Sequence, residues 1–259
     1  MNIRRYKHSG TIGDLIYSLA LVKFTGGGQF YLHMNNINHL TVQYYGSLPL
    51  PFHQGRMNQQ DFDFMKDFML SQEYITDFQK YDSTQVEITD DLDNFRNLFV
   101  GHPGNYVDIY AAIYNIHNPI IKHSLRNSPW LTVKNPKKIE GIEFVVNRTD
   151  RWVTPIPHYA YEQWKKEDVD LKSIFVGLES EYEKFVNQTG WRCQYYPTKT
   201  MIELAEIIAG ADHFIGNQSQ CLSLSIGLGT PWICEVRKDI PLQRNECYFP
   251  NHPQGQYLL

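Results

Sequence analysis

The chain has 259 residues, of which 42% are hydrophobic and 20% charged, as in an ordinary folded protein. A chain of this length buries enough surface to fold without disulfides or metals, and its formal net charge of −4 argues against bulk electrostatic binding of nucleic acid. No secretory signal or bilayer-spanning apolar run is visible and the four cysteines form no C-x-x-C pair, so we expect a cytoplasmic protein with reduced thiols.

The first half of the chain opens as a strand, a turn and a helix. Residues 3–8 are strand-like, and a glycine-containing turn leads into a helix over residues 14–24 with apolar side chains at helical spacing. Three glycines stop this helix, and residues 29–33 form a second strand. Further elements are then predicted, with long loops over 35–58: helices at 60–70 and 106–116, and a strand at 74–78.

The second half alternates strands and helices. The predicted strands are 142–146, 173–177, 193–196, 213–216 and 232–236, and the helices between them are 159–166, 180–188, 200–209 and 219–228. This alternation implies a parallel sheet with helices on both faces. The stretch 124–138, with prolines and lysines, is the best boundary between the halves.

The predicted fold class is therefore α/β, with two Rossmann-like domains whose parallel sheets face each other across a cleft. The first domain is expected over residues 1–130 and the second over 139–240. Residues 241–259 are expected to be a tail that returns toward the first domain.

Ligands of open parallel sheets bind at the carboxyl ends of strands, so the residues that follow the strands are the candidate site. Gly10, Thr11 and Gly13 open a helix after the first strand, where glycines permit close backbone approach and helix amides favour an anion. His8 or Asp14 would take a proton from an acceptor hydroxyl. The alternative for Asp14 is that it only caps its helix.

Two strand ends of the second domain suit a diphosphate. Arg148 and Arg151 follow its first strand, and guanidinium groups bind phosphate in bidentate fashion; the alternative is a surface pair with Asp150. The segment that joins the fourth strand to a helix offers backbone amides to a phosphate, although its last residue can equally be a plain N-cap. This segment consists of Gly216, Asn217, Gln218 and Ser219.

Two further residues complete the predicted donor site. Glu235, beside the last strand, suits the hydroxyls of a ribose, with an ion pair to Arg237 or Lys238 as the alternative. Gly177 ends the second strand of this domain and joins the donor-binding set.

The sequence predicts neither a metal nor a cofactor beyond the donor. D-x-D triplets occur at 61–63, 91–93 and 168–170, which is consistent with chance among 28 acidic residues. The histidines form no metal-binding spacing, and neither a P-loop nor a G-x-S-x-G motif occurs.

Three blocks of the chain resemble the heptosyltransferase-like glycosyltransferases of the GT-B fold. The donor-side block is Glu203–Ser219 followed by Ser225–Pro231; the opening Gly10–Ile16 is similar to the family's glycine-aspartate loop, and Arg148–Trp152 with Tyr161–Trp164 is similar to its basic-Trp segment. The resemblance implies a metal-independent, inverting transfer from a nucleoside-diphosphate sugar, with the donor on the second domain and the acceptor on the first.

The same resemblance assigns roles to residues. Asp14 would be the general base, Arg148 and Arg151 would neutralise the leaving diphosphate, and Asn217 and Ser219 would line the donor site. Three positions depart from the family, with Gln218, Gln220 and Ser223 where Asp, Gly and His are usual, so the resemblance names neither the sugar nor the nucleotide.

Several choices stay open at this stage. The acceptor is a saccharide, a protein or a modified DNA base, the source a bacterium or a bacteriophage, and the protein a monomer or a homodimer. The rival functions are a nucleotide-sugar epimerase of the same fold and a non-catalytic nucleotide-sugar or glycan-binding protein. A single-domain Rossmann oxidoreductase is disfavoured because no G-x-G-x-x-G follows either first strand.

Overall fold

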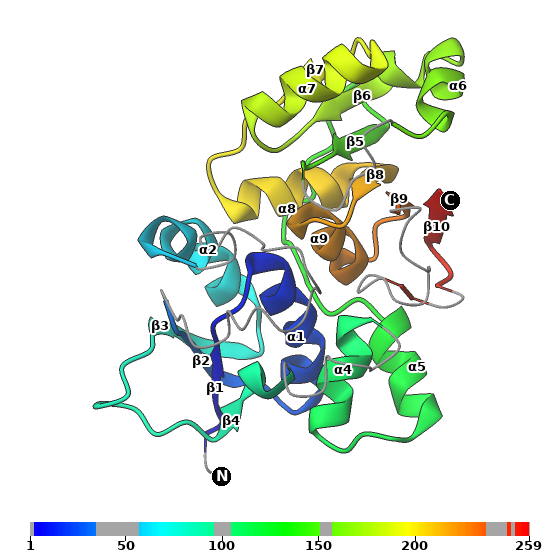
Figure 1. The fold of residues 1–259 in the computed structure, drawn as a ribbon. Helices are drawn as coiled ribbons and strands as arrows, with labels where there is room; N and C mark the ends of the chain where they lie inside the picture. The colour runs from blue at the N-terminus through cyan, green and yellow to red at the C-terminus, as the bar shows by residue number, and fades with distance from the viewer. Residues whose placement is uncertain are drawn as a thin grey trace, which may run out of the picture. The chain divides into compact units, whose positions relative to one another are not determined.

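Figure 1 shows the computed structural model of the chain, which describes residues 3–34, 57–95, 105–150, 157–236, 248–249 and 252–258. The chain divides into two compact units, Met1–Arg126 and Asn127–Leu259. Each unit contains one sheet, and every strand pairing within the described ranges is parallel. The predicted pair of parallel α/β sheets is confirmed.

The sheet of the first unit has the order β3-β2-β1-β4. Its strands are β1 (Arg5–His8), β2 (Gly28–Leu32), β3 (Ile75–Lys80) and β4 (Asp90–Asp91). The described helices are α1 (Ile12–Phe24), α2 (Gln59–Ser71), α4 (Tyr106–Ile113), α5 (Pro119–Asn127) and the short 3-10 helix η2 (Leu92–Asn94). Helix α1 packs against α4, and α2 packs against β3.

Helix α1 is the central helix of this unit. Every residue from Leu15 to Val22 is buried, so the helix has no solvent-facing stripe along this stretch. It begins after the N-cap Thr11 and is followed by Gly27, whose positive φ of +73° and contact with the Tyr74 carbonyl leave no room for a side chain. Packing on all sides gives the start of α1, which carries Asp14, a fixed position in the first unit.

The sheet of the second unit has the order β10-β9-β8-β5-β6-β7. Its strands are β5 (Phe144–Asn147), β6 (Ser173–Phe175), β7 (Gln194–Tyr195), β8 (His213–Asn217), β9 (Trp232–Glu235) and β10 (Gly255–Leu258). The helices are α6 (Ala160–Lys166), α7 (Glu179–Thr189), α8 (Met201–Gly210), α9 (Gln220–Leu228) and the 3-10 helix η3 (Val169–Lys172).

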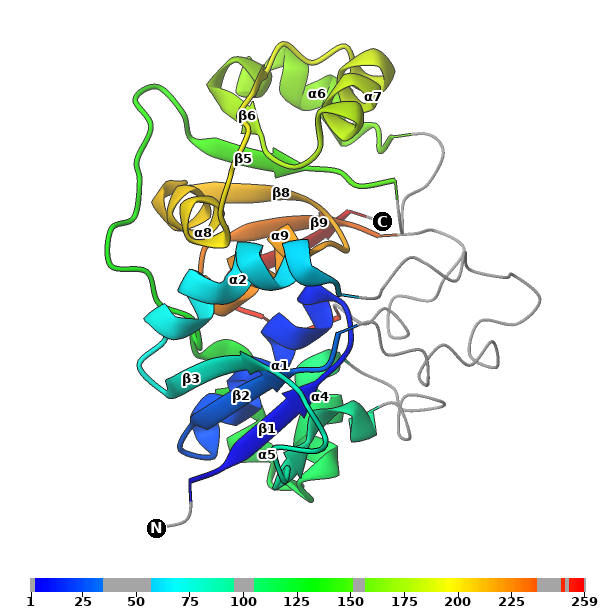
Figure 2. The same cartoon turned by 90° about the vertical axis from the view of Figure 1, so that its left-hand side faces the viewer.

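The strand order fixes which helices share a face of the second sheet. The chain runs from β5 to β6 and β7 in one direction and then returns to β8 and β9 on the other side of β5. Because parallel crossovers are right-handed, this reversal places α6 and α7 on one face and α8 and α9 on the other. Figure 2 shows α6 beside α7, and α8 near α9.

An aromatic core lies between α6, α7 and this sheet. Tyr161 and Phe185 from the helices pack with Phe175 of β6 and with Trp191, whose ring nitrogen donates to the Tyr161 carbonyl at 2.8 Å. Burying one such side chain contributes about 1.5–3 kcal/mol. This core holds α6 and α7 against the sheet.

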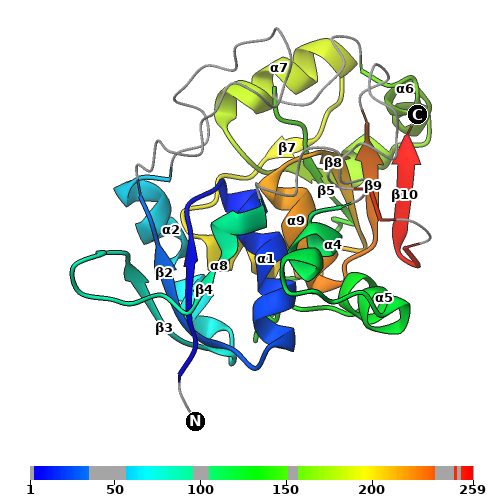
Figure 3. The same cartoon turned by 60° about the horizontal axis from the view of Figure 1, so that its bottom comes forward.

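The last strand, β10, was not predicted. Residues 255–258 pair in parallel with β9, and Figure 3 shows the two strands side by side. The expected tail over 241–259 therefore ends, in its described part, as a strand of the second unit. Gly255 makes the pairing possible, because a side chain there would collide with the Trp232 ring.

The cysteines and the lengths of the helices bear on the expectations about thiols and membranes. Cys193, Cys221 and Cys234 are buried, whereas Cys247 lies outside the described residues. In the ranges that the structure describes, every helix is too short or too polar to cross a bilayer.

Candidate functional site

Each sheet has a switch point, where the order of the strands reverses. In the second sheet it lies between β5 and β8, and in the first between β1 and β4. Ligands of open α/β sheets bind outside the carboxyl ends of the strands at such points. The segments to examine are therefore 147–150 and 217–219 in the second unit, and 8–14 and 91–93 in the first.

Asp14 and Thr11 form a capping box at the start of α1. The Thr11 amide donates to Asp14 Oδ2 at 3.0 Å, and the Asp14 amide donates to Thr11 Oγ1 at 3.4 Å. The carboxylate is half-buried at the positive end of a helix dipole. The capping role considered as the alternative is therefore present, and it holds the carboxylate in place. Gly13 lies inside the first turn of α1, one residue before Asp14.

The other amides of this loop are also bonded to side chains. Ser9 N–H donates to Asp93 Oδ1 at 2.9 Å, and Gly10 N–H donates to His8 Nδ1 at 2.9 Å. Together with Thr11, three consecutive amides therefore have acceptors within the protein. The predicted diphosphate role of Gly10 and Thr11 finds no support from these amides, and the loop is built to present a carboxylate.

His8 is fully buried, at 0% exposure. Its Nδ1 accepts from Gly10, and its Nε2 lies 2.6 Å from the hydroxyl of Tyr110. Each ring nitrogen of His8 already has a hydrogen-bond partner inside the protein, so neither is available to the hydroxyl of a bound acceptor. This arrangement favours Asp14 over His8 as the base.

A charged cluster supports the loop from β4. Lys7 Nζ lies 2.7 Å from Asp91 and 3.5 Å from Asp93, the outer members of one D-x-D triplet. Burial alone would lower the pKa of Lys7, but hydrogen bonds and charges from both carboxylates outweigh it and raise the pKa. This triplet was expected to be a chance occurrence, and β4 is too short to show a strand pattern. The triplet's place directly beside β1 could be found only from the fold.

Arg148 and Glu235, predicted as two separate ligand contacts, bind each other. Arg148 Nε lies 2.7 Å from Glu235 Oε2, a second guanidinium nitrogen reaches Oε1 at 3.1 Å, and the third donates to Gln188 at 3.0 Å. Tyr161 donates to the same carboxylate at 3.3 Å, and burial, followed by the charge of Glu235, raises the pKa of Tyr161. Arg148 is 5% exposed and Glu235 2% exposed. Arg151 lies outside the described residues.

Asn217 ties the loop after β5 to the end of β8. Its Oδ1 accepts from the Thr149 amide at 3.0 Å, and its Nδ2 donates to the Thr149 carbonyl at 3.0 Å. Gln218 follows half-buried, and Ser219 is the N-cap of α9, with its hydroxyl accepting from Leu222 N–H at 3.3 Å. The amide of Asn217 therefore positions a loop, and Ser219 has the capping role considered as its alternative.

Asn147 and two glycines form the floor of the switch point. Asn147 Nδ2 donates to the Val176 carbonyl at 2.8 Å, while its buried Oδ1 has no hydrogen-bond partner among the described residues. A side chain at Gly177, where φ is +125°, would collide with the Asn147 amide, and one at Gly216 would collide with the Asn147 carbonyl. Both predicted glycines thus allow close backbone packing around Asn147.

The loop after β5 is held from four directions. Asn147 is bonded to the residue that follows β6, Arg148 to β9 and Thr149 to the end of β8. Asp150 forms an ion pair with Lys184 of α7 at 2.6 Å. A loop held on a rigid scaffold in this way is typical of a binding site.

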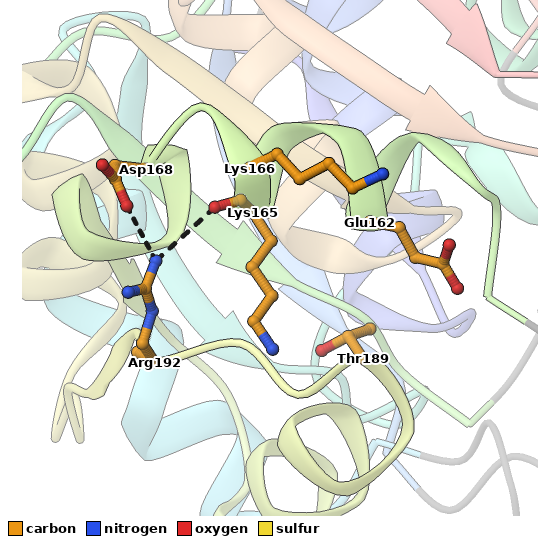
Figure 4. A pocket seen from close by; sticks show the side chains of 6 residues that line it. All are labelled: Glu162, Lys165, Lys166, Asp168, Thr189 and Arg192. Atoms are coloured by element: carbon orange, nitrogen blue, oxygen red, sulfur yellow. Dashed lines mark hydrogen bonds and ion pairs between the residues drawn. The ribbon is translucent and has the colours of Figure 1, made fainter.

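A solvent-open hollow of about 590 Å³ lies elsewhere in the second unit (Figure 4). Its lining consists of Glu162, Lys165, Lys166, Asp168, Thr189 and Arg192. Because α6 and α7 end here and lead into the starts of β6 and β7, the hollow lies at the amino ends of the strands. Arg192 is bonded to Asp168 at 2.9 Å, and the lysines face the negative ends of helix dipoles. We do not assign the site to this hollow.

Metal-ligating side chains do not gather in the described part of the chain: no group of three or more His, Cys, Asp or Glu there could hold an ion. Of the other two D-x-D triplets, Asp61 caps α2, and Asp168 and Asp170 bind Arg192.

No protein-family model and no curated protein matches the chain. Solved structures do. The glycosyl transferase family 9 protein of Veillonella parvula is 10% identical over 100% of this chain and 87% of that chain, with a TM-score of 0.53. The E. coli ADP-heptose LPS heptosyltransferase II is 9% identical over 99% and 90%, with a TM-score of 0.53.

A third similar structure is TibC, an iron-containing dodecameric glycosyltransferase of enterotoxigenic E. coli. It is 13% identical, matches 98% of this chain and 63% of its own, and has a TM-score of 0.58. At these identities the likeness shows the fold: this chain has the two-sheet α/β architecture of these glycosyltransferases. The resemblance seen in sequence blocks is thus found again in the structure.

Proposed function

We propose that the chain is a glycosyltransferase that moves a sugar from a nucleoside-diphosphate sugar to an acceptor hydroxyl, with inversion and without a metal. The observation that carries the proposal is the switch point of the second sheet, where a loop held from four directions meets the start of α9. The shared fold supports it, and so do two of the similar proteins: the E. coli heptosyltransferase II is named for ADP-heptose, and TibC was also solved in complex with ADP-D-β-D-heptose.

The diphosphate is assigned to the start of α9. This helix has no acidic residue in its first turn, whereas α1, α7 and α8 each have at least one. The backbone amides and the dipole at the start of this helix therefore favour a bound anion beside Gln218 and Ser219. Arg148 is assigned to holding the loop through Glu235, and Arg151 keeps its predicted role as a diphosphate ligand.

Asp14 is assigned as the general base. Its carboxylate takes the proton of the acceptor hydroxyl while that oxygen forms a bond to the anomeric carbon of the donor sugar. The bond from this carbon to the diphosphate breaks, and the nucleoside diphosphate leaves with the electron pair. Fixed dipoles and cations stabilise the leaving charge in place of a metal. The acceptor is a hydroxyl of a saccharide, a protein or a modified DNA base.

The first experiment is a thermal-shift panel of nucleoside diphosphates and their sugars. A ligand at 100 times its Kd stabilises the folded state by about 2.7 kcal/mol, so one nucleotide class should stand out. If no nucleotide raises the melting temperature, the donor assignment is wrong.

The second experiment separates the rivals, using the nucleotide sugar that the panel identifies. Sugar transfer to an acceptor supports the proposal. Nucleotide release with no transfer to any acceptor favours the epimerase, and binding with no turnover favours a non-catalytic binding protein.

A further inference from the structure

We infer that His8 and Tyr110 are positioning residues that hold the backbone on both sides of Asp14. The kinetic consequence rests on the proposed function, whereas the geometric part does not. His8 is the last residue of β1 and Tyr110 lies in α4, 102 positions along the chain.

The two side chains form a buried line of hydrogen bonds. Both are 0% exposed. Gly10 N–H donates to His8 Nδ1 at 2.9 Å, His8 Nε2 lies 2.6 Å from the Tyr110 hydroxyl, and that hydroxyl donates to the Asp14 carbonyl at 3.1 Å. The ring of Phe95 packs against both, with centroids 5.9 Å from His8 and 4.9 Å from Tyr110.

These contacts fix the proton positions on the line. Nδ1 of His8 accepts from an amide and so carries no proton. The Tyr110 proton points to a carbonyl, so the phenolic oxygen accepts and Nε2 of His8 donates. His8 is therefore the neutral Nε2–H tautomer. A second proton, on Nδ1, would point at the Gly10 N–H, so that two donors would face each other at 2.9 Å and the hydrogen bond would be lost.

These hydrogen bonds orient the backbone and do not relay a proton to the Asp14 carboxylate. The line ends on the peptide carbonyl of Asp14, which accepts a hydrogen bond but is not a base. Its ends are the Gly10 amide and the Asp14 carbonyl, which flank the capping box in which the Thr11 amide holds the carboxylate of Asp14. The β1–α1 loop is thus fixed at both ends, and the carboxylate has one defined orientation.

The geometric part is tested by NMR on the full chain. We expect the ¹⁵N shifts of His8 at neutral pH to show a proton on Nε2 and none on Nδ1. Tyr110→Phe keeps the ring and removes the hydroxyl, and it should speed exchange of the Gly10 amide on the order of 10-fold. Tyr31→Phe, which loses a hydroxyl bonded to Gln29, is the matched control and should leave this amide unchanged. An Nδ1–H tautomer, or unchanged exchange in Tyr110→Phe, overturns the inference.

The kinetic part uses the same variants. In Tyr110→Phe we expect kcat to fall on the order of 10-fold with the donor KM unchanged, and no further loss when it is combined with Asp14→Asn. A kcat equal to that of the unmodified protein despite faster exchange overturns the positioning role. If the unmodified protein transfers no sugar, the proposed function fails, while the NMR result still decides the geometry.

Discussion

Asp14 is both the cap of α1 and the assigned base, and two substitutions separate these roles. Asp14→Asn keeps an oxygen that accepts from the Thr11 amide, so it loses only the charge at the helix start, worth about 0.3–1 kcal/mol. Asp14→Ala also loses the hydrogen bond, and its total cost should be about 1–2 kcal/mol. Both variants should lose about 10²–10⁴-fold in transfer rate, because neither side chain takes a proton.

The assay pairs urea unfolding with a measurement of sugar transfer from the donor that the thermal-shift panel identifies. The matched control is Asp61→Asn, which makes the same change at the same helix position, in the capping box of Asn58 on α2. It should lose similar stability and no activity. If Asp14→Asn transfers sugar at the full rate, Asp14 is a cap only, and the base assignment is refuted.

Three further predictions concern the second unit. Glu235→Ala removes the carboxylate partner of the buried Arg148 guanidinium, so the free energy of unfolding in urea should fall by about 3–5 kcal/mol. The double change Glu235→Leu with Arg148→Met should restore most of this loss. A loss below about 1 kcal/mol in Glu235→Ala contradicts a stabilising buried pair. The hydrogen bonds of Arg192 lower the pKa of Asp170, so this carboxylate stabilises the fold above its unfolded-state pKa and loses that contribution as pH falls through its lower folded-state pKa. Asp170→Asn should therefore flatten the stability curve as pH falls below the ordinary carboxyl pKa of 3.8, and an unchanged slope contradicts this. Burial raises the pKa of the Cys193 thiol to about 12, so maleimide should label it at pH 7 only after unfolding, and rapid native labelling refutes its burial.

The elements that the sequence predicted are those with local signals. Helix α8 begins after the N-cap Thr200, and α9 lies between the N-cap Ser219 and Gly229 in the left-handed conformation, as their sequences indicate. Strands β4 and β10 were missed because their evidence is not local. The two residues of β4 have no apolar pattern, and β10 exists because β9 offers it an edge.

The strands and the loops that follow them could be predicted, but the side-chain contacts between those loops could not. The strand ends were identified correctly, since the order of strands and helices can be read along the chain. The partner of Arg148 lies 87 residues away and that of His8 102 residues away, and no local pattern encodes either contact. Asn217, predicted as a donor contact, also bonds the backbone of Thr149, which its local sequence does not indicate.

The loop after β5 also has a consequence for how the second unit matures. The loop is bonded to Val176, Asn217 and Glu235, which lie 29, 68 and 87 residues further along the chain than their partners. The bond to Glu235 can therefore form only after β9 has been synthesised. Contacts of such sequence separation form late, because the intervening chain must first be ordered. A nascent or truncated chain that stops before residue 232 has most of its helices but an unfinished loop. The proposed nucleotide binding should therefore begin only after the strand that carries Glu235 has been synthesised.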